Sequence, residues 1–278
     1  MKHIVITGAT NGIGRETARL LAAKHHHLHI IGRSMEKGEA VIEALKRETS
    51  NPNIFFYQAD LSLLEDVRAV AERLGEKLPV VDVLINNAGA LFEKRTVTKE
   101  RLEETFALNY LGVVLLTRTL LPLMRKSTEA RIVNVSSVGH KFAKFEPDNL
   151  QGEKKYGAMK SYAGAKLYLI MFTYELAEQL ESENIQVNAM HPGNISSGFA
   201  MNNKGPYRLL HYFTKYAGDS LKTGADLEAD LAVSEKYSGV TGKYFTPKGE
   251  QASSTASYNK ENRKTLWNVS ESMLASYL

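Results

Sequence analysis

The sequence predicts an α/β protein in which a doubly wound parallel sheet forms a single domain over residues 1–278. Short apolar runs rich in β-branched residues alternate along the chain with stretches of helical periodicity. These runs contain almost no polar residues, as expected for strands that helices cover on both faces. No tandem repeat, low-complexity tract or linker rich in proline and glycine divides the 278 residues.

Six of the apolar runs are predicted to be strands of βαβ units. In chain order they are HIVIT at 3–7, LHIIG at 28–32, IFFYQ at 54–58, VDVLIN at 81–86, RIVNVS at 131–136 and IQVNAM at 185–190. The first run begins at His3, so we expect neither a signal peptide nor an amino-terminal anchor. Beyond the last predicted strand, residues 251–278 are predicted to form a polar helical tail.

Two stretches interrupt the regular alternation, at residues 138–160 and 193–220. Both follow the carboxyl end of a predicted strand, where open α/β sheets bind their ligands. The second stretch is expected to be a substrate-binding loop or lid. Its apolar side chains predict either a pocket for a lipophilic ligand or a helix that packs on the domain, and they are Phe199, Met201, Tyr207, Leu209, Leu210, Tyr212 and Phe213.

Charge and composition limit the partners and the cellular location. The chain has 35 basic and 31 acidic residues, a formal net charge of +4 and no long block of like charge, so we expect no nucleic-acid partner. The chain has no cysteine, which excludes disulfides and thiolate metal sites. This composition is consistent with a reducing compartment, and we expect a cytoplasmic protein.

Residues 110–124, YLGVVLLTRTLLPLM, are the most apolar segment of the chain. The segment is shorter than the roughly 20 residues that span a bilayer, and it contains Arg118. We therefore expect a buried or interface helix and no membrane span.

The histidine-rich run at residues 24–29 is the only candidate for a metal site that the sequence suggests. The run has no acidic partner nearby, and adjacent residues rarely converge on one ion. We expect a solvated turn and no bound metal.

A glycine-rich turn, TGATNGIG at residues 7–14, follows the first predicted strand and opens a helix. Glycines at Gly8, Gly12 and Gly14 permit a tight turn and a close approach of the backbone to a pyrophosphate. The pyrophosphate would bind at the amino terminus of the helix, where amide donors are free. This context predicts a dinucleotide site.

A second motif, YAGAK at residues 162–166, places a tyrosine and a lysine one helical turn apart. Such a pair is either an exposed helix contact or a proton donor with a neighbouring cation. Free tyrosine has a pKa of about 10, and a nearby ammonium favours the phenolate. We therefore expect Lys166 to lower the pKa of Tyr162.

Together these motifs resemble the short-chain dehydrogenase/reductase family, which has a Rossmann fold. The resemblance covers roughly residues 3–250 and follows the family's motif order: the glycine-rich turn, Asp60, NNAG at 86–89, Asn109, NVSS at 134–137, YAGAK at 162–166 and HPG at 191–193. It implies an enzyme that interconverts a carbonyl and an alcohol on a small-molecule substrate by hydride transfer to or from a nicotinamide cofactor.

The end of the second strand, IIGRS, indicates which cofactor is used. An acidic residue here would bind the ribose 2′-hydroxyl of NAD(H), whereas an arginine pairs with the 2′-phosphate of NADP(H). Arg33 occupies the position with Ser34 beside it, so we expect NADP(H) rather than NAD(H). The alternative is that Arg33 is a solvated loop residue.

The resemblance assigns further residues to the cofactor. Asp60 would bind the adenine with Leu61 beside it, although Asp60 is also suited to cap the helix that begins near Ser62. Asn86 is expected to brace the sheet. The other residues expected to line the cofactor are Thr7, Thr10, Asn11, Ile13, Asn87, Ala88, Gly89, Tyr162, Lys166, Pro192, Gly193, Ile195 and Ser197.

By the same resemblance, four residues form a catalytic tetrad. Tyr162 is the acid or base, Ser137 polarises the carbonyl, Lys166 orients and tunes Tyr162, and Asn109 connects Lys166 to a water. Ser136 is expected to point away from the site, because successive side chains alternate along a strand.

The spacing of the tetrad narrows the resemblance. Ser137 and Tyr162 lie 25 positions apart, about twice the separation in many family members, which resembles the retinol dehydrogenase and protochlorophyllide reductase branch. That branch implies NADP(H) and apolar substrates. A homodimer or homotetramer is expected, although the insertion after Ser137 favours a monomer. The alternative function is a sensor or scaffold that binds NADP(H) without turnover.

Overall fold

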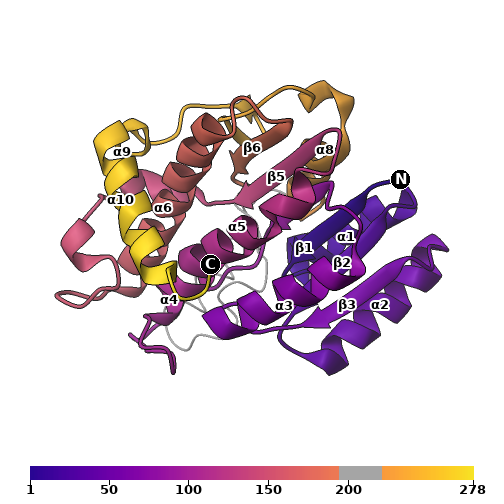
Figure 1. The fold of residues 1–278 in the computed structure, drawn as a ribbon, viewed down its shortest axis with the longest axis horizontal. Helices are drawn as coiled ribbons and strands as arrows, with labels where there is room; N and C mark the ends of the chain where they lie inside the picture. The colour runs from indigo at the N-terminus through magenta and orange to yellow at the C-terminus, as the bar shows by residue number, and fades with distance from the viewer. Residues whose placement is uncertain (194–220) are drawn as a thin grey trace.

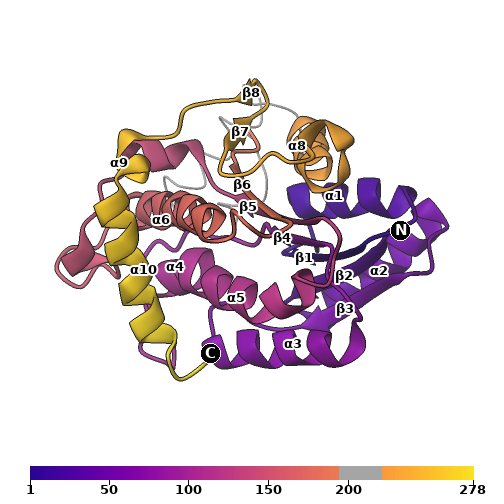
Figure 2. The same ribbon diagram turned by 45° about the horizontal axis from the view of Figure 1, so that its top comes forward.

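The computed structural model describes residues 1–193 and 221–278. In these ranges an eight-stranded sheet has the order β3-β2-β1-β4-β5-β6-β7-β8 and lies between two layers of helices (Figures 1 and 2). Neighbouring strands are parallel from β3 to β7, and β8 is antiparallel to β7. The strands are β1 His3–Thr7, β2 His27–Gly32, β3 Ile54–Gln58, β4 Val83–Asn86, β5 Ala130–Val135, β6 Ile185–Met190, β7 Tyr244–Thr246 and β8 Gly249–Glu250.

This order confirms the doubly wound fold, because the chain winds outward from β1 in both directions. All six predicted strands are present, and β7 and β8 extend the sheet beyond the last of them. On one face, Ile4, Ile6 and Ile30 pack under the first helical layer, and on the other face Val5 and Ile31 pack under the second. The strands are therefore apolar at nearly every position.

The first layer holds α1 Gly12–Ala23, α2 Met35–Thr49 and α8 Leu221–Val233, and the second holds α3 Leu64–Lys77, α5 Gly112–Met124 and α6 Ala158–Gln179 (Figure 2). Shorter elements connect these helices. They are α4 Glu104–Phe106, a π-helical turn at Ala107–Leu111, 3₁₀ turns at Val138–Phe142, Pro147–Asn149 and Glu235–Tyr237, and α9 Thr255–Tyr258.

The helix that contains the apolar segment is longer than the sequence predicts. It runs without a break over Glu104–Met124, 21 residues, which by length and composition alone is enough to cross a membrane. Within the protein, however, 83% of its most apolar window is buried. Its apolar side chains are therefore those of a core helix that packs against α3 and the sheet.

The last helix, α10 Lys260–Leu274, lies across α6 and the amino-terminal part of α5 (Figure 1). Arg263 is almost fully buried and pairs with Glu178 at 2.6 Å. Trp267 stacks on Phe172 of α6, with 5.8 Å between the ring centroids. Residues 251–278, predicted as a polar helical tail, thus complete the core on this side.

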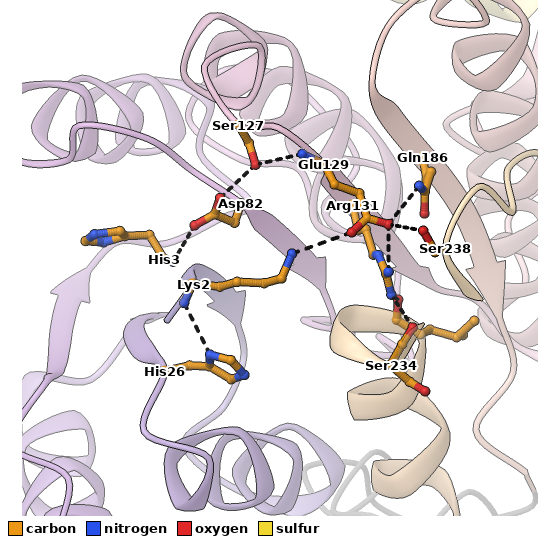
Figure 3. Close-up of polar contacts among 11 residues, drawn as sticks. Lys2, His3, His26, Asp82, Ser127, Glu129, Arg131, Gln186, Ser234 and Ser238 are labelled. Atoms are coloured by element: carbon orange, nitrogen blue, oxygen red, sulfur yellow. Dashed lines mark hydrogen bonds and ion pairs between the residues drawn. The ribbon is translucent and has the colours of Figure 1, made fainter. Parts of the chain in front are cut away.

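A polar network joins the amino-terminal ends of the strands, at the opposite edge of the sheet from the predicted site (Figure 3). The guanidinium of Arg131, which is 3% exposed, donates to Glu129 Oε1 at 2.8 Å and to the Ser234 carbonyl at 2.7 Å. Burial raises the pKa of Glu129, but hydrogen bonds from Arg131, Ser238 and Gln186 outweigh it and bring that pKa to about 2. This network connects β5 and β6 to the end of α8.

The histidine-rich run forms part of a strand, so the predicted solvated turn is wrong for its second half. His27 and His29 lie in β2, and His29 is only 2% exposed. His29 Nε2 lies 3.2 Å from His3 Nδ1, and His29 Nδ1 lies 3.3 Å from the Tyr57 hydroxyl. Burial, followed by the charges of His3 and His27, lowers the pKa of His29 to about 3.

The free energy of unfolding is expected to fall as the pH drops below 6.5. The folded-state pKa of His29 lies below its unfolded value, so its contribution is complete above 6.5 and is lost as the pH falls toward 3. The loss is about 1.4 kcal/mol for each pH unit. Urea unfolding at pH 7.5 and pH 5 measures it, and His29→Gln should flatten the dependence. The exposed His25→Gln is the control, and equal slopes in both variants would contradict the assignment.

Candidate active site

The glycine-rich turn connects β1 to α1 at the carboxyl edge of the sheet (Figure 2). Gly8 has a φ of +70°, and a Cβ at this position would lie 2.8 Å from the Cα of Ala88. Thr7 Oγ1 accepts hydrogen bonds from the amides of Asn87 at 3.0 Å and Ala88 at 2.9 Å. These contacts hold the turn against the end of β4, where only glycine fits.

A second close approach fixes the start of α1. A Cβ on Gly14 would lie 2.4 Å from Asn87 Nδ2, which itself donates to the carbonyls of Thr7 at 2.8 Å and Gly8 at 3.2 Å. Asn11, the N-cap residue, makes no side-chain capping bond. The first amides of α1 therefore lack a side-chain cap, and the turn fits a bound pyrophosphate.

Thr10 and Ile13 complete the predicted turn. The Thr10 methyl group lies 3.3 Å from where a Cβ on Gly32 would be, so Thr10 contacts the end of β2. Ile13, at the start of α1, is 8% exposed. The structure thus brings the turn next to the predicted ribose position at Arg33.

At the end of β2, Arg33 is exposed and its carbonyl accepts a hydrogen bond from Gln58 Nε2 at 3.0 Å. Ser34 is the N-cap of α2, because its Oγ accepts from the amide of Lys37 at 3.3 Å. Burial and the charge of Asp60 raise the pKa of Glu104, and the charge of Arg33 opposes this rise.

Asp60 follows β3 and organises a turn. Its Oδ1 accepts from the amide of Ser62 at 3.0 Å and from the Ser62 hydroxyl at 2.7 Å. The first amides of α3, at Leu64 and Glu65, instead donate to the carboxylate of Glu100 at 2.6 and 3.0 Å. Asp60 therefore caps the turn before α3 and not the helix itself. Leu61, the next residue, is 7% exposed.

Asn86 and Asn87 at the end of β4 have separate tasks, as the sequence predicts. Asn86 is 1% exposed and donates to Thr117 Oγ1 at 3.1 Å and to Asn134 Oδ1 at 2.8 Å, which braces the sheet. Asn87 supports the glycine-rich turn as described above. Ala88 lies against Gly8 of that turn, and Gly89 lies beside Asn109 and Lys166.

Asn109 lies in the π-helical turn between α4 and α5 and is fully buried. Its Nδ2 donates to the carbonyls of Ala90 and Thr105, both at 2.9 Å, and its Oδ1 accepts from the Ala90 amide at 3.2 Å. A Cβ on Gly89 would lie 2.7 Å from Asn109 Oδ1 and 3.1 Å from Lys166 Nζ. Gly89 thus leaves open the space between Asn109 and Lys166. π-helical turns are frequent at functional sites.

The other three predicted catalytic residues meet at the start of α6. Tyr162 is hydrogen-bonded to the side chain of Ser137, which follows β5. Lys166 Nζ donates to the carbonyl of Val135 at 2.9 Å and lies 5.7 Å from the centroid of the Tyr162 ring. Ser136 points away from Tyr162, as predicted, and its Oγ donates to the Lys166 carbonyl at 2.8 Å.

The electrostatics of the pair differ from the prediction. Burial raises the pKa of Tyr162 above its ordinary value, and the bond to Ser137 offsets only part of this rise. Burial also lowers the pKa of Lys166 to about 8. The expected lowering of the Tyr162 pKa by Lys166 is therefore wrong for the protein alone, because desolvation outweighs the charge. At neutral pH Tyr162 is a phenol and is able to donate a proton.

The remaining predicted residues follow β6. Pro192 and Gly193 are buried, and Gly193 has a φ of +99°. Ile195, Ser197 and most of the predicted lid lie outside the described residues. A cavity of about 440 Å³ is present behind α6, where Ser161, Gly164 and Tyr168 line it. By helical spacing these residues face away from Tyr162 and Lys166. Gly139 and Ala163 also line the cavity, and a Cβ on Gly139 would lie 3.5 Å from Ser137 Oγ, so the cavity extends to the neighbourhood of Ser137.

Comparison with known proteins gives one matching family model, described as short chain dehydrogenase, over residues 2–207. Retinol dehydrogenase 12 of Mus musculus is 35% identical over 273 residues, which cover 98% of this chain and 86% of that protein. Polyprenol dehydrogenase of Homo sapiens is 34% identical and covers 96% of this chain, with 83% of its own length matched.

Among solved structures, a short-chain dehydrogenase from Escherichia coli in complex with NADPH matches with a TM-score of 0.66 and 25% identity. The match covers 89% of this chain and 96% of that one.

Proposed function

The chain belongs to the short-chain dehydrogenase family and is an oxidoreductase of alcohol and carbonyl groups; from this premise we propose that it uses NADP(H) and acts on a lipophilic small molecule. The observation that carries the reaction type is the hydrogen bond between Tyr162 and Ser137 beside the buried Lys166. The relatives named for retinol and polyprenol support a lipophilic substrate. The exposed Arg33 at the end of β2 supports NADP(H).

The bound cofactor would supply the hydride, and the residues of the chain handle the proton and the charge. Ser137 Oγ donates a hydrogen bond to the substrate oxygen and stabilises the negative charge that develops there. Tyr162 Oη, protonated at neutral pH, gives its proton to that oxygen. Lys166 Nζ and Asn109, separated only by the space at Gly89, provide the route by which Tyr162 regains a proton.

To test this proposal, we would measure NADPH consumption by the purified protein with a series of apolar aldehydes and ketones. Short polar aldehydes of similar chemical reactivity are the control series. We expect turnover, with kcat/KM at least about tenfold higher for the apolar series, since each buried methylene favours binding by about 0.8 kcal/mol. Binding of NADPH without any turnover would favour the sensor or scaffold function instead.

Replacing Arg33 with aspartate is expected to reverse the cofactor preference. The variant loses a charge-assisted hydrogen bond to the 2′-phosphate, so NADPH affinity should fall about 10- to 100-fold, since such bonds contribute about 1.5–3 kcal/mol. The affinity for NADH should hold or rise, because a carboxylate accepts from the ribose hydroxyl. Fluorescence titration measures both.

Lys37→Ala is the control for the Arg33 variant, because it removes another exposed positive charge, on α2. This control variant should leave the affinities for NADPH and NADH unchanged. Equal NADPH binding by wild type and Arg33→Asp would overturn the cofactor assignment.

A further inference from the structure

His140 is buried next to the predicted catalytic serine and is not singled out by the sequence motifs. It lies in the 3₁₀ turn Val138–Phe142, three residues after Ser137, and its side chain is 0% exposed. Nδ1 lies 2.7 Å from the carbonyl oxygen of Ser137, which also accepts from the His140 amide at 3.1 Å. On the other side of the ring, the amide of Ser254 donates to Nε2 at 3.0 Å.

These two contacts define the protonation state of the ring. A backbone amide only donates, so Nε2 carries the lone pair and the proton is on Nδ1. Nδ1–H then donates to the Ser137 carbonyl, and both bonds are satisfied by this single neutral tautomer. In the doubly protonated ring, Nε2–H would face the N–H of Ser254, and the bond between His140 and the carboxyl-terminal segment would be lost.

The far end of this connection is anchored on the helix that carries Tyr162 and Lys166. Ser253, beside Ser254, shares a hydrogen bond of 2.7 Å with the hydroxyl of Tyr174 on α6 and another of 2.7 Å with the Ser257 hydroxyl. A connection of hydrogen bonds and backbone therefore runs from Tyr174 on α6 through Ser253 and Ser254 to His140 and Ser137. The connection closes where the Ser137 side chain meets Tyr162.

We propose that His140 is a positioning residue: as the neutral Nδ1–H tautomer it joins Ser137 to Ser254 and holds the Ser137 hydroxyl against Tyr162. His140 contacts no reacting atom, and its role rests on the proposed function, in which Ser137 polarises the substrate carbonyl. The arrangement also makes the placement of Ser137 dependent on pH.

The surroundings of the ring determine the direction of this dependence. Burial lowers the pKa of His140 below its ordinary value, the bond to Ser137 opposes the decrease, and the charge of Lys141 adds to it. Tyr244 of β7 packs edge-on at 5.0 Å, and the tyrosines of the neighbouring elements are Tyr174 on α6 and Tyr258 on α9. Because the folded-state pKa lies below 6.5, the connection is complete above pH 6.5 and breaks as the pH falls below it.

Two variants separate positioning from packing. His140→Asn keeps an amide donor near the Ser137 carbonyl but is too short to reach Ser254. Ser254→Pro removes the N–H that faces Nε2 and a hydroxyl that makes no hydrogen bond in the described residues, at a position whose φ of −68° proline adopts. The exposed His25→Asn is the control.

For His140→Asn we expect kcat at pH 7.5 to fall about 10- to 100-fold, the range in which misplaced catalytic groups reduce rates. KM and the affinity for NADPH should be unchanged, and the decrease of kcat at acidic pH expected in the wild type should disappear. Ser254→Pro lacks the bond to His140 at every pH, so its kcat should also fall at pH 7.5 and should lose the decrease at acidic pH. Histidine-labelled NMR of the wild type should show Nδ1–H and a titration below pH 6.5.

A proton on Nε2, or a His140→Asn variant with the kcat and pH profile of the wild type, would overturn the positioning role while leaving the proposed function intact. If His140→Asn does not fold, Ser254→Pro and the NMR titration still test whether His140 positions Ser137. A wild type that shows the expected tautomer but no turnover at neutral pH would instead overturn the proposed function, and the positioning role with it.

Discussion

Tyr162→Phe is expected to lower kcat by roughly 10²- to 10⁴-fold, the contribution that a positioned general acid makes. The phenol lies at the start of α6 in a hydrogen bond with Ser137, and burial keeps it protonated at neutral pH. Removing one oxygen leaves the ring and its packing in place, so the affinity for NADPH should not change. Single-turnover kinetics and a fluorescence titration measure the two quantities separately.

Tyr168→Phe provides a matched control on the same helix. Tyr168 is 4% exposed and packs edge-on against Phe106 and Tyr110, on the side of α6 away from Ser137. Its variant should keep the kcat of the wild type. A Tyr162→Phe enzyme that turns over normally would rule out Tyr162 as the proton donor.

Gly14→Ala is expected to weaken NADPH binding more than tenfold and to lower the free energy of unfolding by about 1–3 kcal/mol, the usual result of overpacking. The new methyl group would lie 2.4 Å from Asn87 Nδ2 and 2.9 Å from the Gly8 carbonyl. The Asn87 amide would have to leave the carbonyls of Thr7 and Gly8, which would open the turn where the pyrophosphate is expected. Titration with NADPH and urea unfolding measure the two effects.

Gly75→Ala is the corresponding control, because Gly75 lies near the end of α3 with nothing within 4 Å of a new Cβ. Alanine is the better helix former, so this variant should gain about 0.5–1 kcal/mol of stability and bind NADPH normally. If Gly14→Ala behaved like Gly75→Ala, the close approach of Asn87 to α1 would not be needed for binding.

The sequence alone predicts most of the sheet and the positions of the motifs along the chain, because both depend on local residue patterns. The β-branched runs predict the strands β1 to β6, and the spacing of Tyr162 and Lys166 predicts one face of a helix. Ser136 also points as predicted, since alternation along a strand determines its direction. Asn86 braces the sheet, as the family resemblance implies.

Other features depend on burial or on contacts that a single sequence does not reveal. The pKa of Tyr162 rises because the folded chain removes it from water, and the helical spacing to Lys166 gives no measure of that desolvation. The π-helical turn at Asn109 adds no signature to the apolar pattern of its helix. His140 is recognisable only once the fold brings Ser254 to its Nε2 atom.

The sequence predicts a polar helical tail over residues 251–278 and does not indicate where this tail packs. The few apolar side chains of α10, above all Leu266 and Trp267, lie on one side and pack on the core. Arg263 is one of the polar residues of this segment, yet it is buried in the protein and paired with Glu178. Composition alone therefore does not give the position of this helix.

The position of α10 has a consequence for synthesis on the ribosome. When α6 and β6 emerge, the nascent chain already contains the glycine-rich turn and all four tetrad residues, but the partners of Phe172 and Glu178 have not yet been translated. The outer face of α6 thus stays uncovered until α10 leaves the exit tunnel. A ribosome that stops before α10 therefore leaves a chain with the predicted tetrad and an open apolar face.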